Sequence, residues 1–254
     1  MSNSILYSPD TLTRGNPSLN VTILDTIDST NTYAKTIAAD RNTLILAYEQ
    51  TAGYGRFQRA WKSGTRTDIM MSLLLVRPTA APGAMVSLYA GFELLKAMEG
   101  YVDKPLAIKY PNDIYIDGKK CAGILVEHIY RGKELERTVI GIGVNVFGDT
   151  APLRIEGITA ASLSEYGFFD DVNVLIERFL SGFFGEQSFL TADAPLFIEK
   201  LARYHMLYDK RVRVIADGEE FACTAKDITV RGGLMLEKGG VSHEYVDVSI
   251  IKIL

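Results

Sequence analysis

Runs of branched and apolar residues alternate, in the first hundred positions, with segments in which apolar residues recur every third or fourth position. Val21–Leu24, Thr43–Tyr48 and Ile69–Val76 are typical of short strands, and the last is apolar enough to be buried on both faces. Residues 28–31, Asp-Ser-Thr-Asn, supply N-cap side chains for a helix between the first two strands. Pro82-Gly83 opens a second helix that ends at Gly100. The pattern predicts a mixed chain of strands and helices.

The middle of the chain is richer in strands. Four consecutive strands are predicted at Ala107–Tyr110, Ile114–Ile116, Cys121–Ile129 and Arg137–Val146. Asp117-Gly118 suits the tight turn of a hairpin, whose two central residues prefer positive φ. Two further helices are expected at Asn173–Phe184 and Pro195–Met206, after a segment at 147–161 with no clear pattern.

From Lys210 onward the pattern is purely that of short strands and glycine turns. The predicted strands are Arg211–Ile215, Glu220–Thr224, Leu234–Leu236 and Tyr245–Ile253. Such a segment favours a small barrel attached to a larger domain. We therefore expect a main domain at 1–207 and a small β-barrel domain at 208–254.

Composition narrows the function classes. The chain has 254 residues, of which 47% are hydrophobic and 23% charged, so it is not of the disordered class, and its net charge of −4 lacks the basic excess expected of a nucleic-acid-binding surface. The start of the chain lacks the basic segment and following apolar run of a secretory signal, and the longest apolar run, Ile69–Val76, is too short to span a membrane. Two cysteines far apart favour a reducing cytoplasm. The three histidines are too scattered to predict a dedicated metal site.

The densest polar segment is Gln50–Trp61, which follows a predicted strand. It contains a Gly-x-Gly, but Gln58 stands where a dinucleotide-binding loop needs its third glycine. Arg56 and Arg59 can each bind phosphate or carboxylate oxygens through two N–H groups, and Trp61 can stack on a purine. A solvated basic turn with a core tryptophan is an equally good interpretation of these residues alone.

Two other clusters could carry chemistry. In Lys109–Asp113, Pro111 interrupts the strand and sets Asn112-Asp113 at a turn, and after the hairpin Lys120 stands close to Gly123. A lysine there can stabilise an anionic transition state, although a lysine-rich hairpin tip and simple turn chemistry are the alternatives. The third cluster, Gly141–Val146, is a strand with two glycines, which indicates either a bulge or the close approach of a ligand.

Taken in order, these segments resemble the biotin–protein ligases over residues 21–254. The resemblance rests on Asp28-Ser29-Thr30-Asn31, on Gln50–Trp61, and on Lys109–Asp113 followed by Lys120–Glu127, with Gly141–Asn145 in support. It implies an α+β fold, in which helices flank a mixed β-sheet and an SH3-like β-barrel forms the C-terminal domain. Members of this family activate biotin with ATP to biotinyl-5′-AMP and pass it to one lysine of a biotin carboxyl carrier domain.

The resemblance also implies a role for each matched residue. The catalytic residues would be Lys120 at the acyl-phosphate junction, Arg56 on carboxylate and phosphates, and Asp113 near the incoming lysine or the metal. The residues expected at biotin are Ser29, Thr30, Asn31, Gln50, Gly53, Tyr54, Gly55, Arg56, Lys120 and Gly123. The residues expected at ATP are Arg56, Arg59, Trp61, Lys109, Asn112 and Asn145, with Mg²⁺ arriving with the nucleotide. The expected partner is a carrier domain of a biotin-dependent carboxylase, and monomer and homodimer are both compatible with the sequence.

The sequence departs from the family pattern at the loop and at the start. Tyr54 replaces a frequent arginine, and Gln58 stands where many members have glycine and others asparagine, so we expect a changed loop path. Residues 1–20 are too few for the helix-turn-helix of the bifunctional members, so repression of transcription is not expected.

Two competing functions follow from the same residues. A lipoate–protein ligase shares the fold and the acyl-adenylate chemistry, but Gly53–Trp61, the polar Ser29–Asn31 and the barrel favour biotin. A non-catalytic regulator that binds biotin or its adenylate would show binding without turnover, and the presence of Arg56 and Lys120 argues against it.

Overall fold

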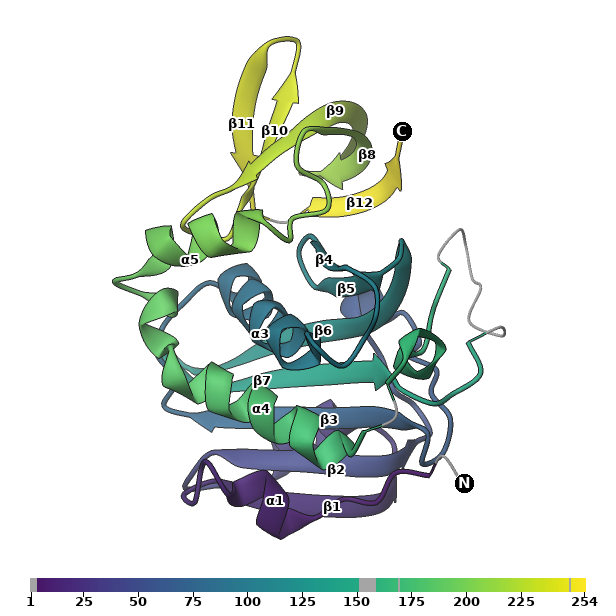
Figure 1. Ribbon diagram of the computed structural model, residues 1–254. Coiled ribbons are helices and arrows are strands. Elements are labelled where there is room, and N and C mark those ends of the chain that lie inside the picture. The colour runs from purple at the N-terminus through teal and green to yellow at the C-terminus, as the bar shows by residue number, and fades with distance from the viewer. Residues whose placement is uncertain (1–3, 151–158, 169, 247) are drawn as a thin grey trace.

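The computed structural model describes residues 4–150, 159–168, 170–246 and 248–254, and it has a large sheet with helices against it and a smaller sheet above (Figure 1). The strands of the large sheet are β1 (Asn20–Ile27), β2 (Thr43–Gln50), β3 (Asp68–Val76), β4 (Leu106–Lys109), β5 (Asp113–Ile116), β6 (Lys119–Arg131) and β7 (Glu134–Asn145). Their order is β1-β2-β3-β7-β6-β5-β4. Only the β1–β2 pair is parallel within the described sheet, so the sheet is mixed, as predicted.

Helices cover the two faces of this sheet unequally. The helices are α1 (Pro9–Thr13), α2 (Thr30–Thr36), α3 (Gly83–Met98), α4 (Val172–Gly185) and α5 (Ala194–Ala202), with short 3₁₀ turns η1 (Arg56–Gln58), η3 (Leu163–Tyr166) and η4 (Gln187–Leu190). Helices α3 and α4 lie across the face that is turned to the viewer in Figure 1. The short helix α2 packs on β2, β3 and β7. The site described below lies on the face that carries α2.

The period-2 alternation of strands explains this division. In β7, Ile140, Ile142 and Val144 belong to the main core with α3 and α4, so the residues between them, Gly141 and Gly143, face the other way. On that second face a small apolar cluster, Ala34, Ile45, Leu74 and Val139, seats α2 against the sheet. The helix predicted after the capping residues 28–31 is therefore confirmed, and it ends at Thr36.

The tight turns follow the sequence closely. Asp117 and Gly118 have φ values of 48° and 73°, and Asp217 and Gly218 have 51° and 81°. Both pairs occupy the left-handed region that a two-residue hairpin turn of this type requires, and glycine accepts that conformation without a Cβ clash. The hairpin predicted at Asp117-Gly118 is thus confirmed, and Asp217-Gly218 forms a second hairpin between the predicted strands Arg211–Ile215 and Glu220–Thr224.

The second sheet holds β8 (Lys210–Ala216), β9 (Glu219–Ile228), β10 (Leu234–Lys238), β11 (Val241–Tyr245) and β12 (Val248–Ile253), all antiparallel, in the order β11-β10-β9-β8-β12. This arrangement is consistent with an SH3-like barrel. The prediction of one strand over Tyr245–Ile253 is wrong, because the chain pairs with β10 up to Tyr245 and with β8 from Val248. The domain boundary near Leu207 stays a prediction.

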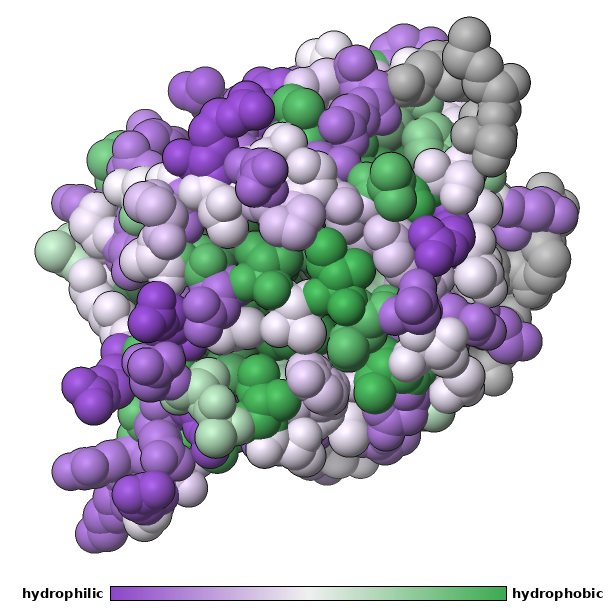
Figure 2. All heavy atoms as spheres, turned by 90° about the horizontal axis from the view of Figure 1, so that it is seen from below, coloured by the Kyte–Doolittle hydropathy of each residue, from purple (hydrophilic) through white to green (hydrophobic). Residues whose placement is uncertain are grey.

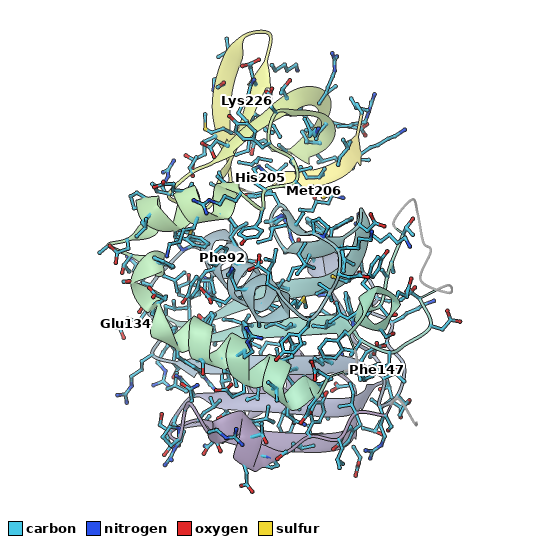
Figure 3. All side chains as sticks on the ribbon, viewed as in Figure 1. Phe92, Glu134, Phe147, His205, Met206 and Lys226 are labelled. Carbon is cyan, nitrogen blue, oxygen red and sulfur yellow. The ribbon has the colours of Figure 1, made fainter. Side chains whose placement is uncertain are left out.

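The small sheet is attached to the large one by backbone and side-chain contacts. Helix α5 ends at Ala202 and not at the predicted Met206, because the next residues pair with β4: Ile108 accepts from the Met206 amide at 3.0 Å. His205 and Met206 lie at this junction (Figure 3). The Tyr110 hydroxyl, at the β4–β5 turn, lies 3.0 Å from the Gly232 carbonyl and 3.2 Å from that of Val246.

The surface at the β1 end of the molecule is partly apolar. Apolar residues gather there between polar ones (Figure 2), and Val21 and Ile23 of β1 are partly buried against the main core.

Helix α1 was not predicted, because its five residues contain too few apolar positions for a periodic pattern. Among the described helices, none combines the length and apolar character that crossing a membrane requires.

Candidate active site

Three glycines on the α2 face of the sheet allow side chains to lie directly on the backbone. Gly123 of β6 and Gly143 of β7 are register partners, and Gly141 is two residues away on the same face. A Cβ at Gly143 would lie 2.5 Å from Trp61 Cζ2, and one at Gly141 would lie 2.8 Å from Asn31 Cγ. The β6–β7 pairing is regular at these glycines, so the interpretation as a bulge is wrong. The groups that approach the backbone here are the side chains of Trp61 and Asn31, and the close approach of a ligand stays a prediction. We call Gly123, Gly141 and Gly143 the glycine floor.

Trp61 reaches the glycine floor at the end of residues 53–61, which we call the glycine loop. The loop is a hairpin closed by two backbone hydrogen bonds, from Trp61 N to Gly53 O and from Gly55 N to Arg59 O, both 2.8 Å long. At its tip Phe57 and Gln58 have φ values of 56° and 57°. The left-handed region favours glycine or asparagine, which gives a physical reason for the residues that the family resemblance implies at position 58.

Hydrogen bonds join the polar residues at the N-terminus of α2 to the neighbouring strands. The Ser29 side chain caps the helix. Gln50 Oε1 accepts from Thr30 N at 2.7 Å and from Thr30 Oγ1 at 3.0 Å. The buried Ser72 hydroxyl, on β3, lies 2.8 Å from Thr30 Oγ1 and 2.5 Å from Asn31 Oδ1. The structure thus brings the predicted Ser29, Thr30, Asn31 and Gln50 together.

A charged group beside Asn31 connects helix, loop and sheet. Lys35 Nζ donates to Tyr54 Oη and to Glu127 Oε1, each at 2.9 Å, and Glu127 Oε2 accepts from Tyr54 Oη at 3.0 Å and from Asn31 Nδ2 at 2.8 Å. Partial burial opposes the charge of Lys35, but its bonds to Tyr54 and Glu127 raise its pKa above the ordinary value. Burial likewise disfavours the Glu127 carboxylate, yet its bonds from Lys35 and Asn31 lower its pKa. Both groups are therefore charged at neutral pH.

The other end of the glycine floor is cationic. Lys120 Nζ lies 2.6 Å from Asp113 Oδ1 and 5.5 Å from the centroid of the Trp61 ring. A Cβ at Gly123 would lie 3.3 Å from that same Nζ, so the glycine makes room for the ammonium group. Burial, with the nearby charges of Lys120 and Arg59, lowers the pKa of Lys109. The predicted Lys120, Asp113, Trp61 and Lys109 are thus near one another.

The remaining predicted residues differ in what they can do. Asn112 Nδ2 donates to Ile124 O at 2.9 Å, a bond that holds the β5 turn. Asn145 Nδ2 donates to Ala161 O at 3.2 Å, while its buried Oδ1 has no partner among the described residues and can accept from a hydroxyl group. Arg59 is exposed and Arg56 half-buried, with its guanidinium 5.0 Å from the Phe57 ring.

Sequence reasoning left two polar residues out of the site entirely. Ser72 lies inside an apolar run, and Lys35 belongs to no motif. The sequence does contain a signal for the two charged residues beside Asn31. Lys35 follows Asn31 by four residues and so lies on the same face of the helix, and Glu127 follows Gly123 by four residues and so lies on the same face of the strand. No group of three metal-binding side chains occurs within the described ranges.

The comparisons with known proteins agree on one family. The model of the biotin/lipoate A/B protein ligase family matches residues 23–145. A biotin–[acetyl-CoA-carboxylase] ligase of Mycobacterium tuberculosis is 32% identical over 206 residues, 78% of this chain and 74% of that protein. The bifunctional ligase/repressor BirA of Bacillus spizizenii is 38% identical over 148 residues, 56% of this chain. This chain spans only 45% of that BirA.

Solved structures share the fold. The biotin protein ligase from Aquifex aeolicus in complex with biotin and ATP has a TM-score of 0.77 and 24% identity, and the match covers 91% of this chain and 98% of that one. The ligase from Leishmania major in complex with biotinyl-5-AMP has a TM-score of 0.60. At 24% identity the structural likeness shows only a shared fold. The Mycobacterium relative, 32% identical over most of both chains, shows the family. The chain therefore belongs to the biotin protein ligase family, within the biotin/lipoate A/B protein ligases.

Proposed function

We propose that this chain activates biotin with ATP and transfers it to a lysine of a biotin carboxyl carrier domain. The observation that carries the proposal is the arrangement on one sheet face: a cationic end at Lys120, a polar end at Asn31 and Gln50, and a glycine floor between them. A ligand with an acid at one end and a polar ring at the other matches this order of groups. Two relatives named biotin–[acetyl-CoA-carboxylase] ligases suggest the reaction to test.

In the first step a carboxylate oxygen of biotin attacks the α-phosphorus of ATP, and the bond to the β-phosphate breaks to release pyrophosphate. Both reactants are anionic, so the barrier depends on positive charge at the reaction centre. Lys120 supplies a compact charge there, with Arg56, Arg59 and Lys109 around the phosphates. Mg²⁺, as part of the nucleotide substrate, offsets more of the charge.

The other roles follow from the hydrogen-bonding groups. Thr30, Asn31 and Gln50 would bind the polar ring of biotin, and the backbone of the glycine loop would cover it, which protects the mixed anhydride from water. Trp61 is expected to pack against the adenine, and Asn145 to accept from the ribose through Oδ1. Asn112 already bonds to Ile124, so its expected part in ATP binding is to hold the turn.

In the second step the neutral amine of the acceptor lysine attacks the acyl carbon, AMP leaves, and one proton is lost from the nitrogen. Asp113 is the carboxylate placed to position that amine, because its ion pair with Lys120 keeps it at the cationic end. The proposed acceptor is the carrier domain of a biotin-dependent carboxylase. We propose the cytoplasm as the location, since both cysteines are free thiols.

The first experiment is ATP–pyrophosphate exchange with biotin, lipoate or octanoate as the acid. Exchange that requires biotin supports the proposed first step, and incorporation of labelled biotin into a purified carrier domain then tests the second. Exchange with lipoate alone would move the activity to the sister ligases. Binding of biotin with no exchange would refute the ligase proposal and favour a regulator.

A further inference from the structure

Tyr54 gives the glycine loop a side-chain anchor within the chain itself. Its hydroxyl accepts from Lys35 of α2 and donates to Glu127 of β6, so one side chain connects three separate segments. The family resemblance implies an arginine at position 54, and beside an arginine Lys35 would meet a second positive charge. With Tyr54 the lysine gains an acceptor instead. Lys35 and Tyr54 therefore match each other chemically.

This group also fixes the amide of Asn31. Glu127 Oε2 accepts from Asn31 Nδ2 at 2.8 Å, and Asn31 Oδ1 receives the Ser72 hydroxyl, so the amide has one orientation. The same carboxylate thus holds a predicted biotin-binding side chain and, through Tyr54, the loop expected to cover the ligand. Removing Lys35 would leave Glu127 with no positive partner among the described residues, which weakens both connections.

An ordinary surface ion pair would have no such effect, and the chain contains one for comparison. Lys35 and Glu127 have side chains 34% and 26% exposed at 2.9 Å, whereas Lys226 and Asp209 are 37% and 63% exposed at 2.7 Å. The two pairs match in distance and in the exposure of the lysine. Lys226 lies in the small barrel (Figure 3), far along the chain from the glycine loop.

We propose that Lys35 is a positioning residue for biotin activation, which acts through Tyr54 and Glu127 to hold the glycine loop over the site before biotin arrives. The proposal rests on the proposed function for the ligand and on the structure for the loop. A loop held in this way before binding lowers the conformational entropy cost of binding, and bound ligand leaves more slowly. Once biotin is bound, the ammonium group of Lys35 takes no part in the reaction.

The first test needs no ligand. Trypsin cleaves after Arg56 and Arg59, so at limiting protease the cleavage rate reports how often the loop opens. We expect Lys35→Met and Tyr54→Phe each to raise this rate about fivefold, the upper range for a partly exposed charged contact. Lys35→Arg should restore it, and the double variant should open no faster than either single one. Lys226→Met should leave the rate unchanged.

The second test uses Trp61, the only tryptophan in the sequence, whose fluorescence reports directly on the site. Lys35→Met should speed the release of biotin about fivefold, because bound ligand leaves only when the loop opens, while single-turnover adenylate formation at saturating biotin changes by less than about twofold. Loop cleavage equal to wild type, or additive effects of Lys35→Met and Tyr54→Phe, would overturn the proposal. A wild-type protein that binds no biotin would refute the proposed function alone, since the cleavage rates still decide whether Lys35 holds the loop.

Discussion

Glu93 makes folding stability depend on pH. It lies in the middle of α3, 7% exposed, and burial together with the nearby charge of Glu186 raises its pKa from 4.5 to about 7, against the opposing effect of Lys200 and Lys96. The folded protein then binds a proton between pH 4.5 and 7 that the unfolded chain releases. The free energy of unfolding therefore falls as pH rises through this window.

The size of the effect follows from the shift. Moving from 4.5 to about 7 is roughly 2.5 pKa units, and at about 1.4 kcal/mol per unit this gives at most about 3 kcal/mol lost between pH 4.5 and pH 8. Glu93→Gln mimics the protonated form and should abolish that loss. At pH 5 the variant should be close to wild type in stability, and at pH 8 it should be more stable.

Urea denaturation at pH 5, 6, 7 and 8 measures both proteins. Glu199→Gln, an exposed position on α5, removes a carboxylate from the surface and is the control, with the wild-type pH dependence expected. Parallel stability curves for wild type and Glu93→Gln would refute the reasoning. So would a wild-type protein that gains stability relative to the variant as pH rises.

Three further predictions concern the site. Lys120→Ala should leave biotin binding largely intact but slow adenylate formation at least tenfold, about 1.4 kcal/mol of barrier or more, in single-turnover kinetics; a wild-type rate would remove Lys120 from the mechanism. Arg56→Gly should speed release of biotinyl-AMP, measured as its off-rate, and an unchanged off-rate would contradict the role given to the loop. Gly143→Ala places a methyl carbon 2.5 Å from Trp61 Cζ2, well inside ordinary contact of about 3.5 Å, so it should displace the indole and shift the Trp61 emission. Gly185→Ala, where a Cβ meets nothing within 4 Å, should leave that emission unchanged.

Local rules accounted for most of the fold. Strand periodicity, the Asp-Gly turns and the capping residue Ser29 act over a few positions, and the corresponding elements formed where expected. The errors came where a distant segment decides. Met206 lies outside the helix because its amide donates to the Ile108 carbonyl of β4. The last predicted strand is two strands, because its first part pairs with β10 and its second part pairs with β8.

The candidate site shows the same contrast between residues that local motifs indicate and residues that only distant contacts bring in. Motifs indicated the candidate residues Lys120, Asp113 and Gln50, since each stands in a short polar segment where a strand begins or ends. Lys35 and Glu127 are 92 positions apart, and nothing local in either segment announces their contact. Ser72 gives no sequence signal for another reason. A single hydroxyl within an apolar strand has no evident role until the structure shows that it donates to Asn31 Oδ1.

The hydroxyl of Tyr110 has a mechanical consequence. It connects the turn in front of Asp113 to the Gly232 and Val246 carbonyl groups, which lie just before β10 and just after β11. Apolar residues on both sides of Leu207 form one continuous core. The small sheet therefore acts as a brace for the cationic end of the site. We therefore expect a substitution that loosens the C-terminal strands to loosen the turn that carries Asp113, and with it the ion pair of Asp113 with Lys120.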